Sequence, residues 1–148
     1  VMLTLGTGVG CGIICDGKIL RGKTGAAGEV PFLLAGRDFA ALAYQNGLQE
    51  QDCFAICKLK DEKNPAAVKA FSEWQNRLAD CVSLLNNILD TEAVALSGSL
   101  AEIVDYPIVE KAINAKGYHN PLRLEKSLTG NDAGLIGAAL LLKDKING

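Results

Sequence analysis

The decisive stretch of this chain is Leu3-Thr4-Leu5-Gly6-Thr7-Gly8-Val9-Gly10-Cys11-Gly12, in which four glycines stand at alternate positions directly after an apolar strand. Glycine lets another group approach the backbone closely, and clustered backbone N–H groups form an anion-binding concavity without any basic side chain. The stretch therefore predicts a turn that contacts a phosphate group.

The residues that follow decide which kind of phosphate loop this is. In a dinucleotide-binding fold or a P-loop the glycines would open a helix, whereas Ile13 to Leu20 is typical of a β-hairpin around an Asp-Gly turn. Ile19 also stands where a P-loop needs Ser or Thr to bind magnesium. Both nucleotide fingerprints are excluded. A phosphate-contacting hairpin remains, with a tight β-meander that needs glycine only for packing as the alternative on these residues alone.

Length and composition limit the class of protein. With 148 residues, 49% of them hydrophobic, the chain can bury the core of one domain. The net charge of −2 and the lack of a basic run predict no contact with nucleic acid, and no apolar stretch reaches the ~20 residues that cross a bilayer. Five cysteines, an odd number, fit reduced thiols and a cytoplasmic location. Because Val1 opens directly into a core strand, we expect a piece of a longer protein.

Hydrophobic periodicity predicts an α/β domain. We expect a three-stranded antiparallel meander (1–5, 12–15 and 18–21), a short helix from Asp38 and a long helix from Asn64-Pro65. The apolar stripe of the long helix comprises Val68, Phe71, Trp74, Leu78, Val82, Leu85 and Leu89. A buried strand (91–96), a broken helix (100–115), a last strand (121–126) and a small-residue helix lying on the sheet (133–143) complete a mixed sheet flanked by helices.

Four motifs, taken in order and spacing, resemble the C-terminal half of the ROK family of bacterial sugar kinases and repressors. They are Gly6-Thr7-Gly8-Val9-Gly10, Gly25-Ala26-Ala27-Gly28-Glu29, Ser97-Gly98-Ser99 and Asp132-Ala133-Gly134-Leu135-Ile136-Gly137-Ala138-Ala139. The resemblance implies that residues 1–148 form the single C-terminal lobe of a two-lobed protein with an actin-like, ribonuclease-H-like fold. Its N-terminal lobe is not part of this sequence.

The resemblance also implies where ATP lies. In the family the glycine hairpin is the second phosphate loop, which places Gly6, Thr7 and Gly8 against the terminal phosphates, where amides and a hydroxyl stabilise developing charge. The glycine turn after the next parallel strand, Gly98 with Ser99, lies by the adenosine. The general base and the loop that holds Mg²⁺ belong to the N-terminal lobe, so no catalytic residue is expected here.

The predicted sugar contact is Glu29, which matches the carboxylate that the family places on sugar hydroxyls. Typical members put a His three residues later and then a cysteine cluster that binds structural zinc. Here Phe32 replaces that His, and Cys53 and Cys57 lack the spacing and the partners of a tetrahedral site, so no zinc is expected.

Two further features are read as structural. The pair Asn131-Asp132 precedes the last helix and is interpreted as a helix cap rather than as the family's catalytic Asn-Asp. His119, the only histidine, is expected at the surface.

The preferred function is the ATP-binding lobe of a sugar kinase, which transfers the γ-phosphoryl group of Mg-ATP to a hexose hydroxyl and is inactive without its other half. The expected partners are a sugar, the N-terminal lobe and further copies of the chain. Two alternatives remain open: the sugar-sensing effector domain of a ROK repressor and a degenerate, non-catalytic sugar-binding protein.

Overall fold

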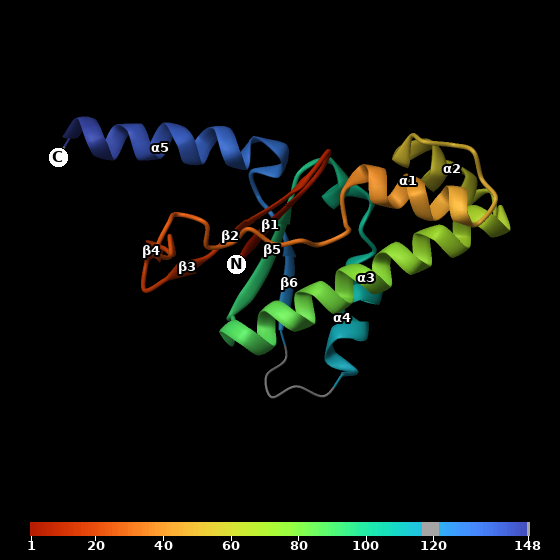
Figure 1. Cartoon of the computed structure of the whole chain (residues 1–148), viewed down its shortest axis with the longest axis horizontal. Helices are drawn as coiled ribbons and strands as arrows, with labels where there is room; N and C mark the ends of the chain where they lie inside the picture. The colour runs from red at the N-terminus through yellow and green to blue at the C-terminus, as the bar shows by residue number, and fades with distance from the viewer. Residues whose placement is uncertain (117–121, 148) are drawn as a thin grey trace.

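A computed structural model describes residues 1–116 and 122–147, so the expectations for His119 and for the start of the last strand at Pro121 lie outside the described residues. The elements in chain order (Figure 1) are β1 (Met2–Leu5), β2 (Val9–Gly12), β3 (Ile14–Cys15), β4 (Lys18–Ile19), α1 (Gly36–Gln45), α2 (Cys53–Asp61), α3 (Pro65–Leu89), β5 (Ala93–Ser97), η1 (Ser99–Ile103), α4 (Tyr106–Asn114), β6 (Arg123–Lys126), η2 (Gly130–Asp132) and α5 (Ala133–Asn147).

The main sheet is mixed, as the sequence predicts. Its strand order is β2-β1-β5-β6, with β1 antiparallel to β2 and parallel to β5, and β5 parallel to β6. The two central strands therefore end at the same edge, where Leu5 faces Val9 and Thr4 faces Ser97. This edge carries the glycine turn and the turn after β5.

Helices cover one face of the sheet. Leu3 and Leu5 are buried while Thr4 between them is exposed, which is the alternation of a sheet with one covered face. Val94 and Leu96 of β5 continue the buried row. Helix α3 runs beneath the sheet in Figure 1 and packs against α1, α2 and α4.

Helix α3 begins where its sequence predicts. Asn64 caps it by accepting from the backbone N–H of Ala66 at 3.0 Å, and Pro65 occupies the first turn, where a missing N–H costs nothing. Trp74 is fully buried, stacks on Phe39 with ring centroids 5.4 Å apart, and anchors the helix in the core.

The apolar stripe of α3 differs slightly from the expected one. Val68 is 43% exposed, and the buried face runs instead through Ala67 and Ala70 before it reaches Trp74, Leu78 and Val82. The small side chains of Ala67 and Ala70, rather than the larger Val68, therefore face the core at the start of the helix.

Two expectations about the strands and helices were wrong. The strand that pairs with β1 is β2 at Val9–Gly12 rather than the expected 12–15, and the expected second and third strands correspond to β3 and β4, which pair only with each other outside the main sheet. The Asp16-Gly17 turn between them is present, with both residues at positive φ. No helix is expected between the short helix and the long one, but α2 lies there and is capped by Asp52, whose side chain accepts from the N–H of Ala55 at 2.7 Å.

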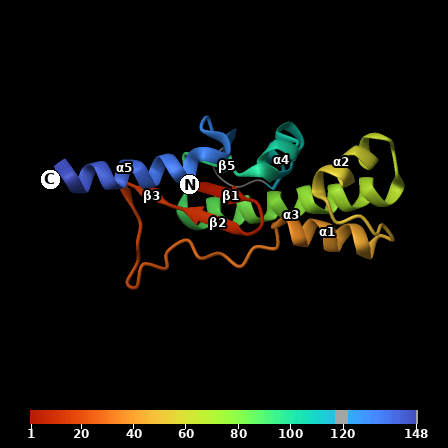
Figure 2. The same cartoon turned by 90° about the horizontal axis from the view of Figure 1, so that it is seen from above.

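Helix α5 was expected to lie on the sheet, but it does not. It projects from the body of the molecule, at the end opposite α1 and α2 in both views (Figures 1 and 2). Leu135 is 75% exposed and Leu140 is 56% exposed. None of the helices in the described ranges combines the length and the apolar character that crossing a membrane requires.

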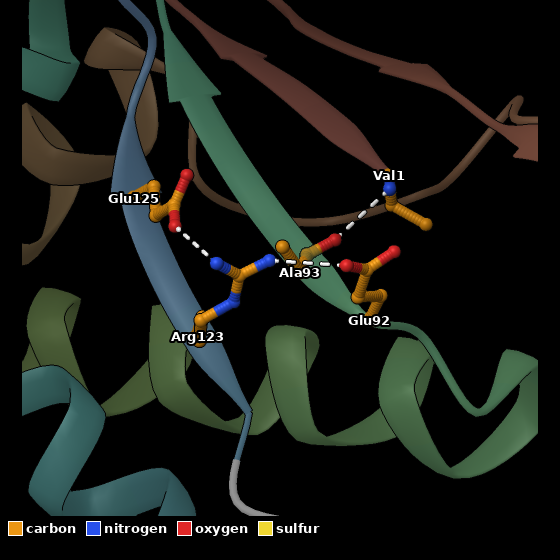
Figure 3. A network of polar contacts seen from close by, with 5 residues as sticks. All are labelled: Val1, Glu92, Ala93, Arg123 and Glu125. Atoms are coloured by element: carbon orange, nitrogen blue, oxygen red, sulfur yellow. Dashed lines mark hydrogen bonds and ion pairs between the residues drawn. The ribbon is translucent and has the colours of Figure 1, made fainter.

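Polar contacts close the edge of the sheet opposite the glycine turn (Figure 3). Arg123 of β6 reaches Glu92 at 3.2 Å and Glu125 at 3.5 Å, and the backbone nitrogen of Val1 donates to the carbonyl of Ala93 at 3.0 Å. Because these side chains are exposed, each ion pair stabilises the fold by at most about 1 kcal/mol. These contacts join the ends of β1, β5 and β6, and we assign them a structural role.

Candidate functional site

The turn between β1 and β2 consists of Gly6, Thr7 and Gly8. The N–H of Gly6 donates to the carbonyl of Gly8 at 3.0 Å, which closes the turn on itself, and the carbonyl of Gly6 accepts from the N–H of Gly36 at 2.8 Å. A Cβ added at Gly8 would meet nothing within 4 Å, so the space beside this residue is open. The turn is thus anchored from behind by the start of α1 and bare in front.

The turn after β5 brings η1 against the end of β1. Gly98 has a φ of 87°, and a Cβ at this position would lie 2.3 Å from the carbonyl oxygen of Leu5. Only glycine fits such an approach without displacing backbone. This contact sets Ser99 beside the glycine turn, where its Oγ lies 3.9 Å from the position of a Cβ on Gly6.

These two turns form one hollow of about 520 Å³, here called the glycine hollow. It lies at the carboxyl ends of the central strands, the usual place for ligands in open α/β sheets. Its lining consists of Thr4, Gly6, Thr7, Gly8, Val9, Gly10, Gly98, Ser99 and Asn131. The five residues predicted to contact ATP are therefore brought together.

The lining of the glycine hollow carries no ionisable side chain. Its polar groups are backbone amides, the hydroxyls of Thr4, Thr7 and Ser99, and the carboxamide of Asn131. Neutral donors around an open space suit an anion, because each can donate a hydrogen bond without a counter-charge of its own. The hollow offers no carboxylate for a divalent cation.

Four lining residues were not assigned to the site from the sequence: Thr4, Val9, Gly10 and Asn131. Asn131 was expected to cap the last helix, but it lies in η2 and makes no side-chain hydrogen bond with any described residue. Its position directly after the last strand, at the edge where β1 and β5 also end, was the available signal.

Glu29 is not brought to the glycine hollow. Its side chain is exposed, at the end of a loop that touches β2 through Gly28. A Cβ on Gly28 would lie 2.2 Å from the carbonyl oxygen of Cys11, so glycine is required for this close approach. Phe32, which replaces the family's His, is partly buried against the core and offers no polar group.

The cysteines of α2 do not form a metal centre in the part of the chain that the structure describes. No group of three or more His, Cys, Asp or Glu side chains gathers there in an arrangement that could hold an ion. Cys53 donates its thiol to the carbonyl of Gly36 at 3.4 Å, and burial raises the pKa of the Cys57 thiol to about 11. A protonated thiol is a poor zinc ligand. The absence of zinc stays a prediction.

The family model for the ROK family matches residues 1–37 and 30–145. The chain belongs to the ROK family. The two matches overlap at residues 30–37, directly after Glu29.

N-acetylmannosamine kinases are among the curated relatives of this ROK chain. An N-acetylmannosamine kinase of Salmonella typhi is 30% identical in an alignment of 164 positions, gaps included, which covers 95% of this chain and 55% of the relative. One of Pasteurella multocida is 29% identical, over 97% of this chain and 55% of the relative. The ROK chain therefore spans about half the length of the curated relatives it matches.

Solved structures of ROK proteins share the fold, which is that of the actin-like ATPases. A ROK family glucokinase from Streptomyces griseus, in complex with glucose and AMPPNP, superposes with a TM-score of 0.76 at 23% identity, covering 95% of this chain and 59% of that one. A ROK family transcriptional regulator, a homolog of the E. coli MLC protein, gives 0.66 at 19% identity, covering 84% and 40%. The fold is thus common to kinases and regulators.

Proposed function

We propose that this chain is the C-terminal lobe of a two-lobed sugar kinase, which transfers the γ-phosphoryl group of Mg-ATP to a hydroxyl of a hexose. The observation that carries the proposal is the glycine hollow, which gathers Gly6, Thr7 and Gly8 with Gly98 and Ser99 at the carboxyl ends of β1 and β5. The curated sugar kinases that the chain resembles support the reaction class.

In this proposal the terminal phosphates of ATP lie against the β1–β2 turn. The Thr7 hydroxyl and the backbone amides donate to phosphate oxygens and stabilise the charge that develops on them during transfer. The adenosine lies by Gly98 and Ser99. The residues present fit the phosphate groups but not the metal, because no carboxylate lines the hollow. Mg²⁺ is therefore held by ATP and by the N-terminal lobe, which also supplies the general base.

The proposal requires a second lobe, and α5 supports it. An apolar helix with Leu135 and Leu140 exposed is unfavourable in water unless another surface covers it. We assign this surface to the N-terminal lobe, and we expect the chain to be inactive without it. A homo-oligomeric state and a cytoplasmic location belong to the same proposal.

The sugar is the less constrained part of the proposal. Glu29 is assigned to sugar hydroxyls, and its position outside the glycine hollow is compatible with a sugar that lies next to the phosphates rather than among them. N-acetylmannosamine is the first sugar to test because it is in the names of the curated relatives.

Calorimetric titration of the 148-residue chain with Mg-ATP tests the nucleotide site. Gly8→Val should abolish the binding heat, because its side chain would occupy the hollow, while the fold persists since a Cβ there meets no neighbour. Gly12→Val is the matched control: its Cβ is equally unhindered, but Gly12 does not line the hollow. Equal ATP affinity of the Gly8→Val variant and the unaltered chain would contradict the proposed site.

The repressor alternative keeps its support in the regulator that shares the fold. In that case the chain would bind a sugar without ATP. A degenerate, non-catalytic protein is favoured by Phe32 in place of the family's His. Titrations with N-acetylmannosamine and glucose, each with and without Mg-ATP, separate a kinase, which binds nucleotide and sugar, from a repressor, which binds sugar alone. A phosphorylation assay on the two-lobed protein identifies a degenerate member, which binds sugar without turnover.

A further inference from the structure

Asn131 stands opposite the glycine turn on the segment that joins β6 to α5. Two hydrogen bonds fasten this segment to the end of β5. The hydroxyl of Ser97 donates to the carbonyl of Gly130 at 2.6 Å, and the N–H of Ser127 donates to the carbonyl of Leu96 at 2.7 Å. The backbone that carries Asn131 is thus fixed against the same strand whose end carries Gly98 and Ser99.

The side chain of Asn131 brings a chemical group that the hollow otherwise lacks. The remaining polar side chains of the lining are hydroxyls, whereas a carboxamide presents two N–H donors and one carbonyl acceptor. No hydrogen bond joins this carboxamide to any side chain or backbone group among residues 1–116 and 122–147. Its donors therefore remain available to a ligand in the hollow.

We propose that Asn131 is a further nucleotide-binding residue, whose carboxamide N–H groups donate to phosphate oxygens of the bound nucleotide. This inference rests on the proposed function, because it takes the glycine hollow as the phosphate site. The glycine turn contacts the phosphate chain from the β1 side and Asn131 contacts it from the side of η2. Two walls fastened to neighbouring strands hold the anion in one orientation, which in-line transfer requires.

The neighbouring residue gives a matched pair of opposite charge changes. Asn131→Asp keeps the size of the side chain but places an anion in the lining. Asp132→Asn removes an anion just outside the lining, since Asp132 is exposed and does not line the hollow. If Asn131 donates to phosphate, the first change weakens binding, while the second leaves binding unchanged or strengthens it.

The experiment is a calorimetric titration of the unaltered chain, Asn131→Asp and Asp132→Asn with Mg-ATP, inorganic tripolyphosphate and adenosine. Loss of a hydrogen bond to a charged group predicts that Asn131→Asp binds Mg-ATP and tripolyphosphate about tenfold or more weakly. Adenosine affinity should not change. The unfolding temperature without ligand should equal that of the unaltered chain, because the exposed side chain loses no hydrogen bond; Asn131→Ala is the second variant, with the same expected loss.

The outcomes separate this inference from the proposed function. Unaltered tripolyphosphate affinity in both Asn131 variants overturns the role of Asn131 but leaves the phosphate site in place. An equal loss for adenosine and tripolyphosphate also overturns it, since the residue would then shape the hollow rather than contact phosphate. If the unaltered chain binds neither Mg-ATP nor tripolyphosphate, the proposed function and this inference both fall.

Discussion

Substitution by alanine should destabilise the fold at Gly98 but not at Gly8, although both glycines line the same hollow. Gly98 has φ 87° and ψ 170°, a region that costs other residues about 1–3 kcal/mol. A Cβ there would also lie 2.3 Å from the carbonyl oxygen of Leu5 and 2.9 Å from its nitrogen, so β1 or η1 must shift. Both Leu5 and Leu100 are buried, and displacing packed core elements costs about another 1–3 kcal/mol.

Gly98→Ala should therefore lower the free energy of unfolding by about 2–6 kcal/mol. Urea denaturation followed by circular dichroism measures this loss, and the thermal midpoint should fall by at least about 5 °C. Gly8→Ala is the control, because its Cβ meets nothing within 4 Å, and its effect should stay within about 0.5 kcal/mol. A Gly98→Ala variant as stable as the unaltered chain, or an equally destabilised Gly8→Ala, would refute the division into one structural and one ligand-facing glycine.

Three further predictions concern the core, a thiol and the last helix. Trp74→Ala should destabilise the fold by about 3–5 kcal/mol in urea denaturation, because the indole is fully buried and donates to the carbonyl of Leu34 at 3.2 Å; a loss below 1 kcal/mol would contradict this packing. Burial raises the pKa of the Cys57 thiol from 9.0 to about 11, so the folded protein keeps a proton that the unfolded chain loses. The free energy of unfolding should fall as the pH rises from about 9 towards 11, and Cys57→Ser should make this decline shallower in pH-dependent denaturation; an unchanged slope would argue against it. Without the second lobe that is proposed to cover α5, the 148-residue chain should self-associate through the exposed Leu135 and Leu140. Leu135→Gln with Leu140→Gln should therefore reduce self-association in analytical ultracentrifugation and leave the thermal midpoint unchanged, whereas a lower midpoint would mean that α5 packs on the body of this chain.

The mixed sheet and the start of the long helix could be predicted from the sequence. Asn64 followed by Pro65 marks the start of α3 through local hydrogen bonding, and local signals of this kind do not depend on the rest of the fold. The alternation of glycine after β1 likewise predicts a bare turn. A chain with β-α-β order implies that β1 and β5 are parallel neighbours and end at the same edge of the sheet. The glycine turn after β1 and Gly98 after β5 are therefore expected to meet.

The parts that could not be predicted depend on contacts distant in sequence. The short helix α2 has only a modest apolar face, and it is stabilised by packing on α3, although Asp52 with the donor at Ala55 was a usable cap signal. Asn131 looks like a cap in sequence because Asn is common before helices. Its place in the hollow depends on the bond from Ser97 to Gly130, which no local pattern reveals.

The exposed surface of α5 shows a further limit of sequence patterns. An apolar helix with small residues is compatible with packing on its own sheet or on another lobe, because both surfaces remove the same side chains from water. Hydrophobic content alone does not say which surface is used. The structure decides this for the described residues by leaving Leu135 and Leu140 exposed.

The chain contains a single tryptophan, Trp74. Two hydrogen bonds and the short backbone segment between them connect its indole to the glycine turn. Trp74 donates to the carbonyl of Leu34, and two residues further on the N–H of Gly36 donates to the carbonyl of Gly6. If a ligand displaces the turn, we expect the change to reach the indole through the segment from Leu34 to Gly36. The fluorescence of this single tryptophan would then report occupancy of the turn without an attached dye.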